Sequence, residues 1–170
     1  MSTTSPEEIL THLLEKFPEG SVSLVKDTGS AMQHSLLLQH EKAVAIANTL
    51  RDDPQFRFDY CSNVTGMDWP KEGFLEAVYH LYSIEKKTAK PLILRMRTKG
   101  RDSKIPADLA MPSFTSVWRS CELQEREVYD LYGILYSSHP DLRRLLMWDE
   151  FQGHPMRKDY APPAENPPAA

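Results

Sequence analysis

The side chains that could do chemistry are concentrated between positions 122 and 158 of this 170-residue chain. Acids come first, because Glu122, Glu125, Glu127 and Asp130 all fall within residues 122–130. Paired carboxylates can act as acid and base in hydrolysis, although acids are abundant on helices. Arg126 lies four residues from both Glu122 and Asp130, so these three side chains can also form a ladder of ion pairs. The pattern leaves three interpretations open: a hydrolytic site, a solvated charged face, and carboxylates that await cations, either from a partner or from Arg143, Arg144, Arg157 and Lys158.

Two histidines, His139 and His154, follow the acids, and each precedes a proline. Proline favours extended backbone at the residue before it. Histidine can serve as a general base or a metal ligand, but neither of these has another His or a Cys within ligand spacing, and catalytic zinc normally takes three protein ligands. We therefore expect both histidines to fix turns or to bond to carbonyl oxygens.

A basic pair follows each histidine, Arg143-Arg144 after the first and Arg157-Lys158 after the second. Guanidinium groups suit buried recognition of carboxylates, and aromatic, Met and Arg side chains are enriched at interface cores. Large apolar residues without a steady period separate the two pairs: Leu145, Leu146, Met147, Trp148 and Phe151. We expect this segment to lie on another protein, and folding over its own domain is the alternative.

The elements that must position this segment begin with a helix. Ser5, Pro6 and Glu8 form a capping box with proline at the first helical position, which predicts a helix that ends near Pro18. The next expected elements are strands over 21–25 and 33–39, paired as a hairpin through a turn at 27–30, and a helix over 41–50.

The strongest strand pattern runs from Phe74 to Ile84, with apolar groups on both alternating faces, as expected for the interior of a sheet. Residues 92–98 alternate apolar and basic groups and predict its antiparallel partner. The last helix is expected to end at Gly133 in a left-handed conformation. It should cover residues 115–132, and loops are expected over 62–73 and 99–111.

Together these elements predict an α+β fold, with a small mixed or antiparallel sheet, helices on one face, and an extended C-terminal arm after it. The α+β domain is expected at 1–133, a partner-binding arm at 134–160, and a disordered Pro/Ala-rich tail at 161–170.

Composition argues against several classes of protein. A net charge of −4 and a pI near 5.9 disfavour a general nucleic-acid binder. No apolar run approaches the roughly 20 residues that cross a bilayer, and the acidic N-terminus does not resemble a signal peptide. Cys61 and Cys121 are expected to be reduced, buried thiols. Phosphate-binding glycine loops, nucleophile elbows and iron–sulfur cysteine clusters are not found, so the sequence contains no recognisable active site.

Three stretches carry a resemblance to a known family: EREVYDLYGI at 125–134, HPDLRRLL at 139–146 and GHPMRKDY at 153–160. They resemble the C-subunit of NADH:quinone oxidoreductase, in the peripheral arm of respiratory complex I. The strand around residues 79–83 and the Pro112-Ser113 entry to the last helix fit as well, so the resemblance covers most of 50–160. Leu123 and Ser138 depart from the family's usual Trp and Gly, and both look like packing adjustments.

The resemblance implies a non-catalytic accessory subunit that docks on the neighbouring D-subunit next to the quinone site and binds no cofactor itself. NAD, FMN, iron–sulfur clusters and quinone would belong to the complex, whose iron–sulfur subunits would be further partners. The chain would lie peripherally on the cytoplasmic side of the inner (plasma) membrane, touch the membrane only through the complex, and bind no nucleic acid.

The residues expected to bind the partner or anchor the arm are Glu125, Arg126, Glu127, Asp130, His139, Asp141, Arg143, Arg144, His154, Arg157 and Lys158. One alternative is an equivalent scaffold subunit of a membrane-bound [NiFe]-hydrogenase or formate hydrogenlyase complex. The other is a stand-alone hydrolase that uses the helix carboxylates and a histidine.

Overall fold

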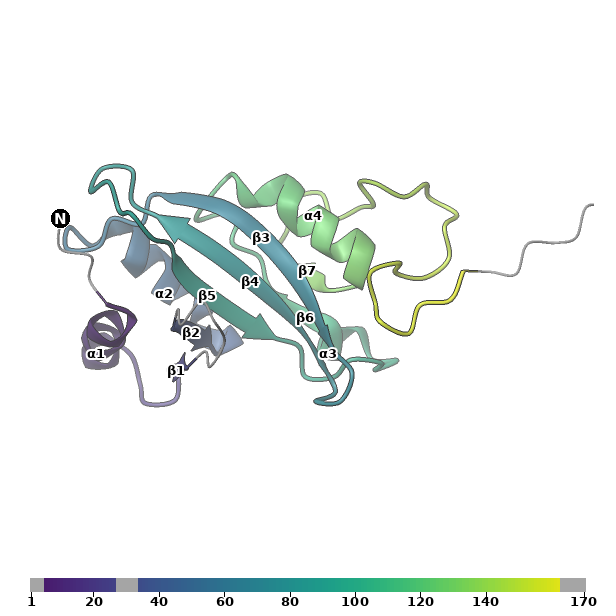
Figure 1. Cartoon of the computed structure of the whole chain (residues 1–170), viewed down its shortest axis with the longest axis horizontal. Helices are drawn as coiled ribbons and strands as arrows, with labels where there is room; N and C mark the ends of the chain where they lie inside the picture. Colours follow the sequence, from purple (N-terminus) through teal and green to yellow (C-terminus); the bar gives the residue numbers. More distant parts are fainter. Residues whose placement is uncertain (1–4, 27–33, 163–170) are drawn as a thin grey trace, which may run out of the picture.

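The computed structural model describes residues 5–26 and 34–162, so the turn expected at 27–30 and most of the tail lie outside the described residues. The main sheet consists of β1 (Val22–Val25), β2 (Ser35–Leu38), β3 (Tyr60–Trp69), β4 (Phe74–Tyr82) and β5 (Leu92–Arg97). Its strand order is β1-β2-β5-β4-β3 (Figure 1). Neighbouring strands are antiparallel except β2 and β5, which are parallel, so the sheet is mixed.

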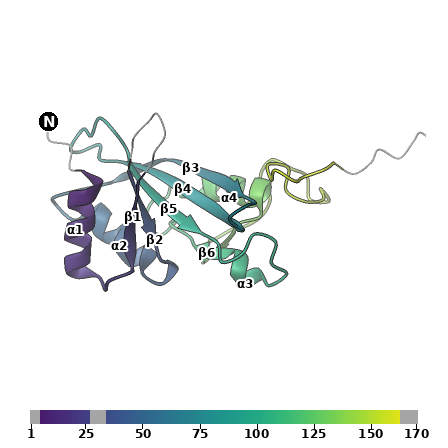
Figure 2. The ribbon, with the colours of Figure 1, turned by 60° about the horizontal axis from the view of Figure 1, so that its bottom comes forward.

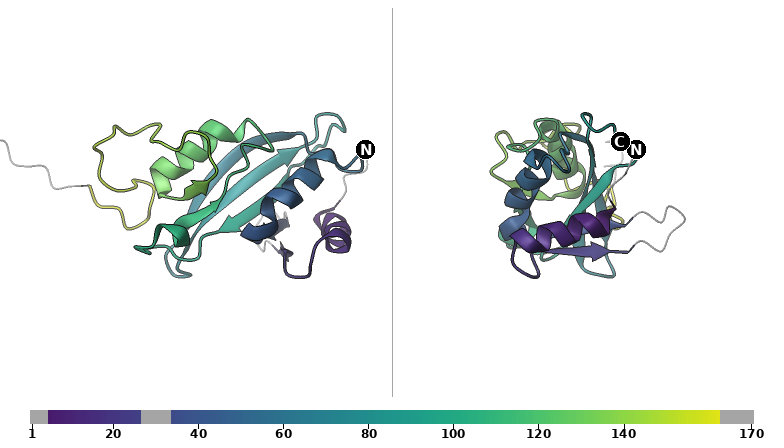
Figure 3. Two further views of the ribbon diagram at one scale, coloured as in Figure 1. Left: turned by 180° about the vertical axis from the view of Figure 1, so that it is seen from behind. Right: turned by 90° about the vertical axis from the view of Figure 1, so that its left-hand side faces the viewer.

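Helices cover one face of this sheet. The helices are α1 (Pro6–Lys16), α2 (His40–Asp52), α3 (Pro106–Leu109) and α4 (Cys121–Tyr132), and a second, parallel pair of strands is formed by β6 (Ala110–Pro112) and β7 (Leu135–Ser137). Figure 3, seen from behind, shows α2 and α4 in front of the sheet, whereas Figure 1 shows the opposite face of β3, β4 and β5 without a helix over it. Figure 2 shows α1 beside β1, at the end of the sheet farthest from β3. The predicted α+β fold is confirmed.

The core lies between the sheet and these helices. Leu36, Leu94, Tyr79 and Val64 follow one another in register across four strands, and all four are buried in the same apolar cluster. Burying large apolar side chains of this kind stabilises a fold by roughly 1.5–3 kcal/mol for each. Among the described residues, no helix is long and apolar enough to cross a membrane.

The local signals at the start of the chain are confirmed. The side chain of Ser5 accepts a hydrogen bond from Glu8 N at 3.2 Å, and Glu8 Oε2 accepts one from Ser5 N at 2.9 Å. Helix α1 turns Ile9 and Leu13 into the core. The expected hairpin of β1 and β2 forms, and β4 lies between β3 and β5 as predicted for an interior strand.

The prediction of a loop over residues 62–73 is wrong, because β3 occupies most of this range. Its buried positions include Gly66 and Asp68, which are poor strand formers and obscure the alternation in the sequence. Glycine is required at position 66 because a Cβ there would lie 2.3 Å from Cδ2 of Tyr132. The small residue lets α4 approach the strand closely.

The last helix is shorter than expected. It begins at Cys121, and the residues before it form turns in which Trp118 N donates to Phe114 O at 2.8 Å. Its end is as predicted, because Gly133 has a left-handed φ of 78°. The loop expected over 99–111 contains α3 and the start of β6, and the short strand β7 was not expected.

Candidate functional site

Residues 138–162 contain no helix or strand, and we call them the C-terminal segment. Figure 1 shows this segment looping out next to α4, at the end of the molecule opposite α1. Its main chain and side chains are bonded to two places on the folded domain, one on α4 and one at the end of β3.

The first anchor is Asp130, whose side chain is fully buried on α4. One carboxylate oxygen accepts from Arg144 Nη1 at 2.6 Å, and the other accepts from three consecutive backbone N–H groups, of residues 145, 146 and 147, at 3.0, 2.7 and 2.8 Å. Burial alone would raise the pKa of Asp130, but these donors outweigh it and hold the pKa below its ordinary value. A charged carboxylate therefore fixes the main chain of the segment.

Arg126 supports the same region from one turn earlier on α4. Its guanidinium donates to the carbonyl oxygens of Arg143 and Arg144 at 3.2 and 3.1 Å, and Nη1 lies 3.6 Å from a carboxylate oxygen of Asp141. No ion pair joins Arg126 to Glu122 or Asp130 in the described part of the chain, so the ladder that the spacing allows does not form. Arg126 instead bonds to residues of the C-terminal segment.

Both histidines bond to carbonyl oxygens of α4, as predicted. His139 Nε2 lies 2.9 Å from Glu122 O, and His139 Nδ1 accepts from Asp141 N at 3.1 Å, which assigns the proton to Nε2. His154 Nδ1 lies 2.9 Å from Asp130 O. Burial lowers the pKa of His154, which favours the neutral form of its ring.

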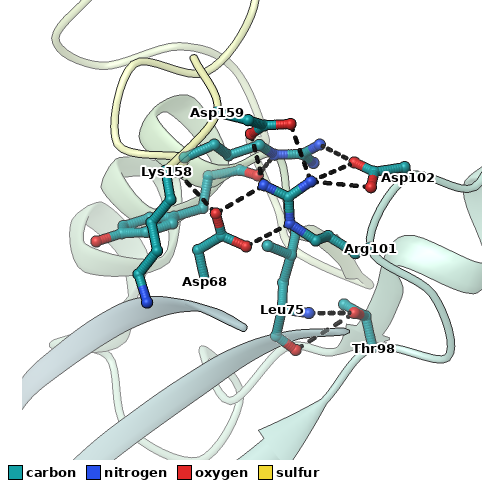
Figure 4. Close-up of polar contacts among 9 residues, drawn as sticks. Asp68, Leu75, Thr98, Arg101, Asp102, Lys158 and Asp159 are labelled. Atoms are coloured by element: carbon teal, nitrogen blue, oxygen red, sulfur yellow. Dashed lines mark hydrogen bonds and ion pairs between the residues drawn. The ribbon is translucent and has the colours of Figure 1, made fainter. Parts of the chain in front are cut away.

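The second anchor is a cluster around Arg101, a residue that the sequence patterns did not single out (Figure 4). Its guanidinium donates to both carboxylate oxygens of Asp68 at 2.6 and 2.8 Å and to Asp159 Oδ2 at 3.1 Å. The side chains of Arg101 and Asp68 are only 4% and 1% exposed. Asp68 Oδ2 also accepts from Lys158 N at 2.7 Å. The guanidinium of Arg101 lowers the pKa of Asp68, so the end of the segment is held by a buried charged group.

Arg157 lies between the two anchors and bonds to the end of α4. Its Nε donates to Tyr132 O at 2.7 Å, and its Nη1 lies 3.4 Å from Asp102 Oδ1. Space here is tight, because a Cβ at Gly133 would lie 2.5 Å from His154 Nε2. Glycine is therefore needed at this position both for its backbone conformation and for the close approach of the segment.

Glu125 faces away from the C-terminal segment and into the core. It accepts from Ser113 Oγ at 2.6 Å, Phe114 N at 2.8 Å and Tyr79 Oη at 3.1 Å. Burial raises the pKa of Glu125 to about 7 in spite of these donors. Its bonds fasten α4 to β4 and to the loop after β6. Both candidate histidines, His139 and His154, bond to carbonyl oxygens of α4 instead, so the structure does not join Glu125 to either of them as an acid–base pair.

Arg143 and Glu127 remain at the surface. Arg143 is 71% exposed and pairs only with Asp141, at 2.9 Å, among the described residues. Glu127 is exposed, and its side chain forms no hydrogen bond or ion pair within the same part of the chain. The two adjacent arginines therefore differ in environment, because Arg144 is bonded to Asp130 and Arg143 is left to solvent.

Several large apolar side chains of the segment are exposed although its main chain is fixed. Leu146 is 55% exposed, Trp148 63% and Met156 53%. Phe151 is half-buried between Trp148, at a centroid distance of 4.8 Å, and Tyr160, at 5.9 Å. These apolar groups belong to the same segment as the exposed Arg143.

The described residues offer no group of three or more His, Cys, Asp or Glu side chains that could hold a metal ion. Cys61 and Cys121 are free and buried, as expected for reduced thiols. A cavity of about 700 Å³ lies at the start of α2, and smaller ones of about 350 and 210 Å³ adjoin the C-terminal segment.

Comparison with known proteins places this fold in a family. Residues 36–166 match the family model for the 30 kDa subunit of respiratory-chain NADH dehydrogenase. The second C-subunit of NADH-quinone oxidoreductase in Rhizobium etli is 37% identical over 150 residues, which are 87% of this chain and 73% of the relative. The C-subunit of the corresponding oxidoreductase in Streptomyces coelicolor is 40% identical over 138 residues, 80% of this chain, but the chain spans only about half (51%) of that relative.

Two solved structures share the fold. A chain of the membrane-bound sulfane sulfur reductase, an archaeal respiratory membrane complex, matches with a TM-score of 0.69 at 24% identity, covering 91% of this chain and 85% of that one. A trypsin-resistant fragment of Nqo5 matches with a TM-score of 0.54 at 24% identity, covering 79% of this chain and 99% of the fragment.

Proposed function

Because the chain belongs to the 30 kDa subunit family of respiratory-chain NADH dehydrogenases, we propose that it is an accessory structural subunit of an NADH–quinone oxidoreductase. It docks on a D-subunit-like protein next to the quinone site and binds no cofactor of its own. Electrons from NADH pass to quinone through FMN and iron–sulfur clusters held by its partners. The complex holds the chain peripherally at the cytoplasmic side of the membrane.

One observation carries this proposal: the main chain of the C-terminal segment is fixed by buried charges, yet several of its large apolar side chains, Leu146, Trp148 and Met156, are exposed to solvent. These three side chains lie on one short segment, and exposed apolar patches mark interaction sites. Exposed apolar side chains on an already ordered main chain are typical of binding surfaces. Binding then costs less conformational entropy, because the main chain does not have to be ordered when the partner binds. Aromatic side chains such as Trp148 dominate the energy of many interfaces.

The residues predicted for the site divide into two roles under this proposal. The exposed Arg143 and Glu127 face the partner together with the apolar side chains. The others hold the segment in place or, like Glu125, hold α4 on the sheet: Arg126, Asp130, His139, Asp141, Arg144, His154, Arg157 and the backbone of Lys158. The proposed partner-binding arm at 134–160 includes β7 near its start. This strand pairs with β6 of the domain.

Purification of the tagged chain from membranes in a mild detergent tests the proposal. The wild-type chain should recover a D-subunit-like protein and iron–sulfur subunits, identified by mass spectrometry. A Leu146→Ser, Trp148→Ser variant should recover about tenfold less of them, because it removes apolar contact area without touching the anchors. The matched control is Ile84→Ser, which changes an apolar side chain that is 64% exposed after β4.

Two results would contradict the proposal. Recovery of the wild-type chain alone, as a monomer, would show that the segment serves only its own domain. Equal recovery with the double variant would show that the exposed apolar groups do not bind the partner. Companions that include a nickel-binding large subunit would instead place the chain in a hydrogenase-type complex, the alternative scaffold role.

A further inference from the structure

A hollow of about 210 Å³ lies where the end of β3, the end of α4 and the C-terminal segment meet. Met67 and Trp69 line it from β3, Tyr132 from α4, and Met156 and Lys158 from the segment. Pockets for small molecules and cofactors typically measure roughly 300–1,000 Å³. This hollow is smaller, and its size and mostly apolar walls fit a single protein side chain.

The segment side of the hollow is held rigidly, although its side chains are exposed. Met156 N donates to Leu131 O at 3.1 Å, and Lys158 N donates to the buried Asp68 at 2.7 Å. Arg157, between them, is fixed to Tyr132 O at 2.7 Å. Met156 is nevertheless 53% exposed. Its position therefore does not result from burial in this chain.

The cation at the rim lacks an anionic partner within the described residues. Lys158 Nζ lies 5.7 Å from the centre of the Trp69 ring, and no carboxylate of the described chain lies within ion-pair distance of it. Figure 4 shows its side chain leading away from Asp68 and Asp159, whose carboxylates bind Arg101 instead. The ammonium group is thus free to receive a carboxylate from outside.

We propose that this hollow receives one apolar side chain of the neighbouring protein, on a stretch that places an aspartate or glutamate beside Lys158. The apolar side chain packs on Met67, Tyr132 and Met156, while the carboxylate pairs with the ammonium group above Trp69. Apolar anchors that fill preformed pockets supply much of the energy of protein interfaces, and charges at the rim set register and partner choice. The inference rests on the proposed function, because the occupant belongs to the protein on which the chain docks.

Site-specific cross-linking in the purified complex identifies the occupant. A diazirine-bearing amino acid in place of Met156 should cross-link, on illumination, to one companion protein at an apolar residue within a few positions of an Asp or Glu. The same amino acid at Ile84 is the control and should not react with that position. Cross-links from position 156 that reach only this chain or lipid would overturn the inference.

Charge reversal tests the role of Lys158 separately. Lys158→Glu should weaken binding of the cross-linked protein by about tenfold, and changing the acid next to the cross-linked residue to Lys should restore it. Lys90→Glu, an equal change at an exposed lysine before β5, should leave binding unchanged. Thermal melting of the free variants should lie close to that of the wild type, since the ammonium group forms no ion pair within the described chain and its contact with the Trp69 ring contributes little at this exposed position.

The two proposals fail in different ways. If the wild-type chain recovers no companion, the proposed function is wrong. If the complex assembles but Lys158→Glu binds as well as the wild type, or the reversed acid gives no rescue, only this inference falls.

Discussion

The sheet domain and the C-terminal segment are each fixed by a different kind of buried side chain. In the sheet, apolar residues such as Leu36, Leu94 and Tyr79 lie inside. Where the segment meets the domain, charged groups lie inside: Asp130 of α4 and Asp68 of β3 are buried against main-chain N–H groups of the segment and against arginines, while Leu146 and Trp148 remain outside. The comparison shows how a chain can order an apolar surface without covering it. Carboxylates fix the main chain, so the apolar side chains stay available to a partner.

Asp130→Ala should have the largest effect on the segment. It removes the acceptor for three backbone N–H groups and leaves the guanidinium of Arg144 without its counter-charge, a change that costs about 3–5 kcal/mol at buried pairs. Limited trypsin digestion should cut within residues 138–162 much faster, while circular dichroism of the sheet is retained. Glu127→Ala, an exposed acid on the same helix, is the control. Unchanged resistance of the segment would mean that other contacts hold it.

Leu94→Ala should act on the other region. It empties a fully buried position in the middle of the sheet and should lower the free energy of unfolding by about 2–5 kcal/mol. Urea denaturation followed by circular dichroism measures this loss, which should appear as destabilisation of the whole sheet. Ile84→Ala, at an exposed site, should change stability by less than about 0.5 kcal/mol. A loss confined to the C-terminal segment would contradict the division between the regions.

The regions should also respond to pH with opposite sign. The pKa of Glu125 is about 7 in the folded chain against an ordinary 4.5, so the folded chain binds this proton more tightly. The contribution of the protonated Glu125 to the free energy of unfolding is complete below pH 4.5 and is lost as the pH rises toward 7. The total loss is roughly 3 kcal/mol at most. The pKa values of Asp130 and Asp68 lie below their ordinary 3.8, so their stabilisation is present above that pH and is lost as the pH falls through the folded values.

Urea denaturation at pH 5 and pH 7.5 measures the contribution of Glu125. The wild type should lose stability relative to Glu125→Gln at the higher pH, because the variant is neutral at both. The histidines titrate in both proteins, so their effect cancels when the free energy of unfolding of the variant is subtracted from that of the wild type. A constant difference between the two pH values would show that the carboxyl group of Glu125 does not change its proton between them.

Arg143→Glu should have the smallest effect on the fold. Its partner Asp141 is also largely exposed, and exposed pairs contribute about 0–1 kcal/mol. Arg144→Glu, by contrast, should release the segment to trypsin, since it places a second carboxylate against Asp130. Equal behaviour of the two variants would show that the adjacent arginines share one role, as the sequence alone suggested.

Elements with local signals could be predicted from the sequence. The capping box of Ser5 and Glu8, the antiparallel pairing of β4 with β5 and the left-handed end at Gly133 all depend on residues close together in the chain. The motifs over residues 125–160 likewise indicated the family without a structure. Local patterns were sufficient for the helix ends and the strand pairing because short-range geometry governs them.

Only the tertiary structure decided which charges meet. Asp68 was expected in a loop, yet it is buried at the end of β3 against Arg101, which comes 33 residues later, and against the main chain of Lys158, 90 residues later. Nothing local distinguishes these charges from solvated ones such as Glu127. Similarly, spacing allowed Asp130 either to pair along its own helix or to bind a cation such as Arg144, and the structure decides for Arg144 and three N–H groups of the returning chain. The cost of burying a charge is offset by donors that only the folded chain brings together, which is why spacing alone cannot assign them.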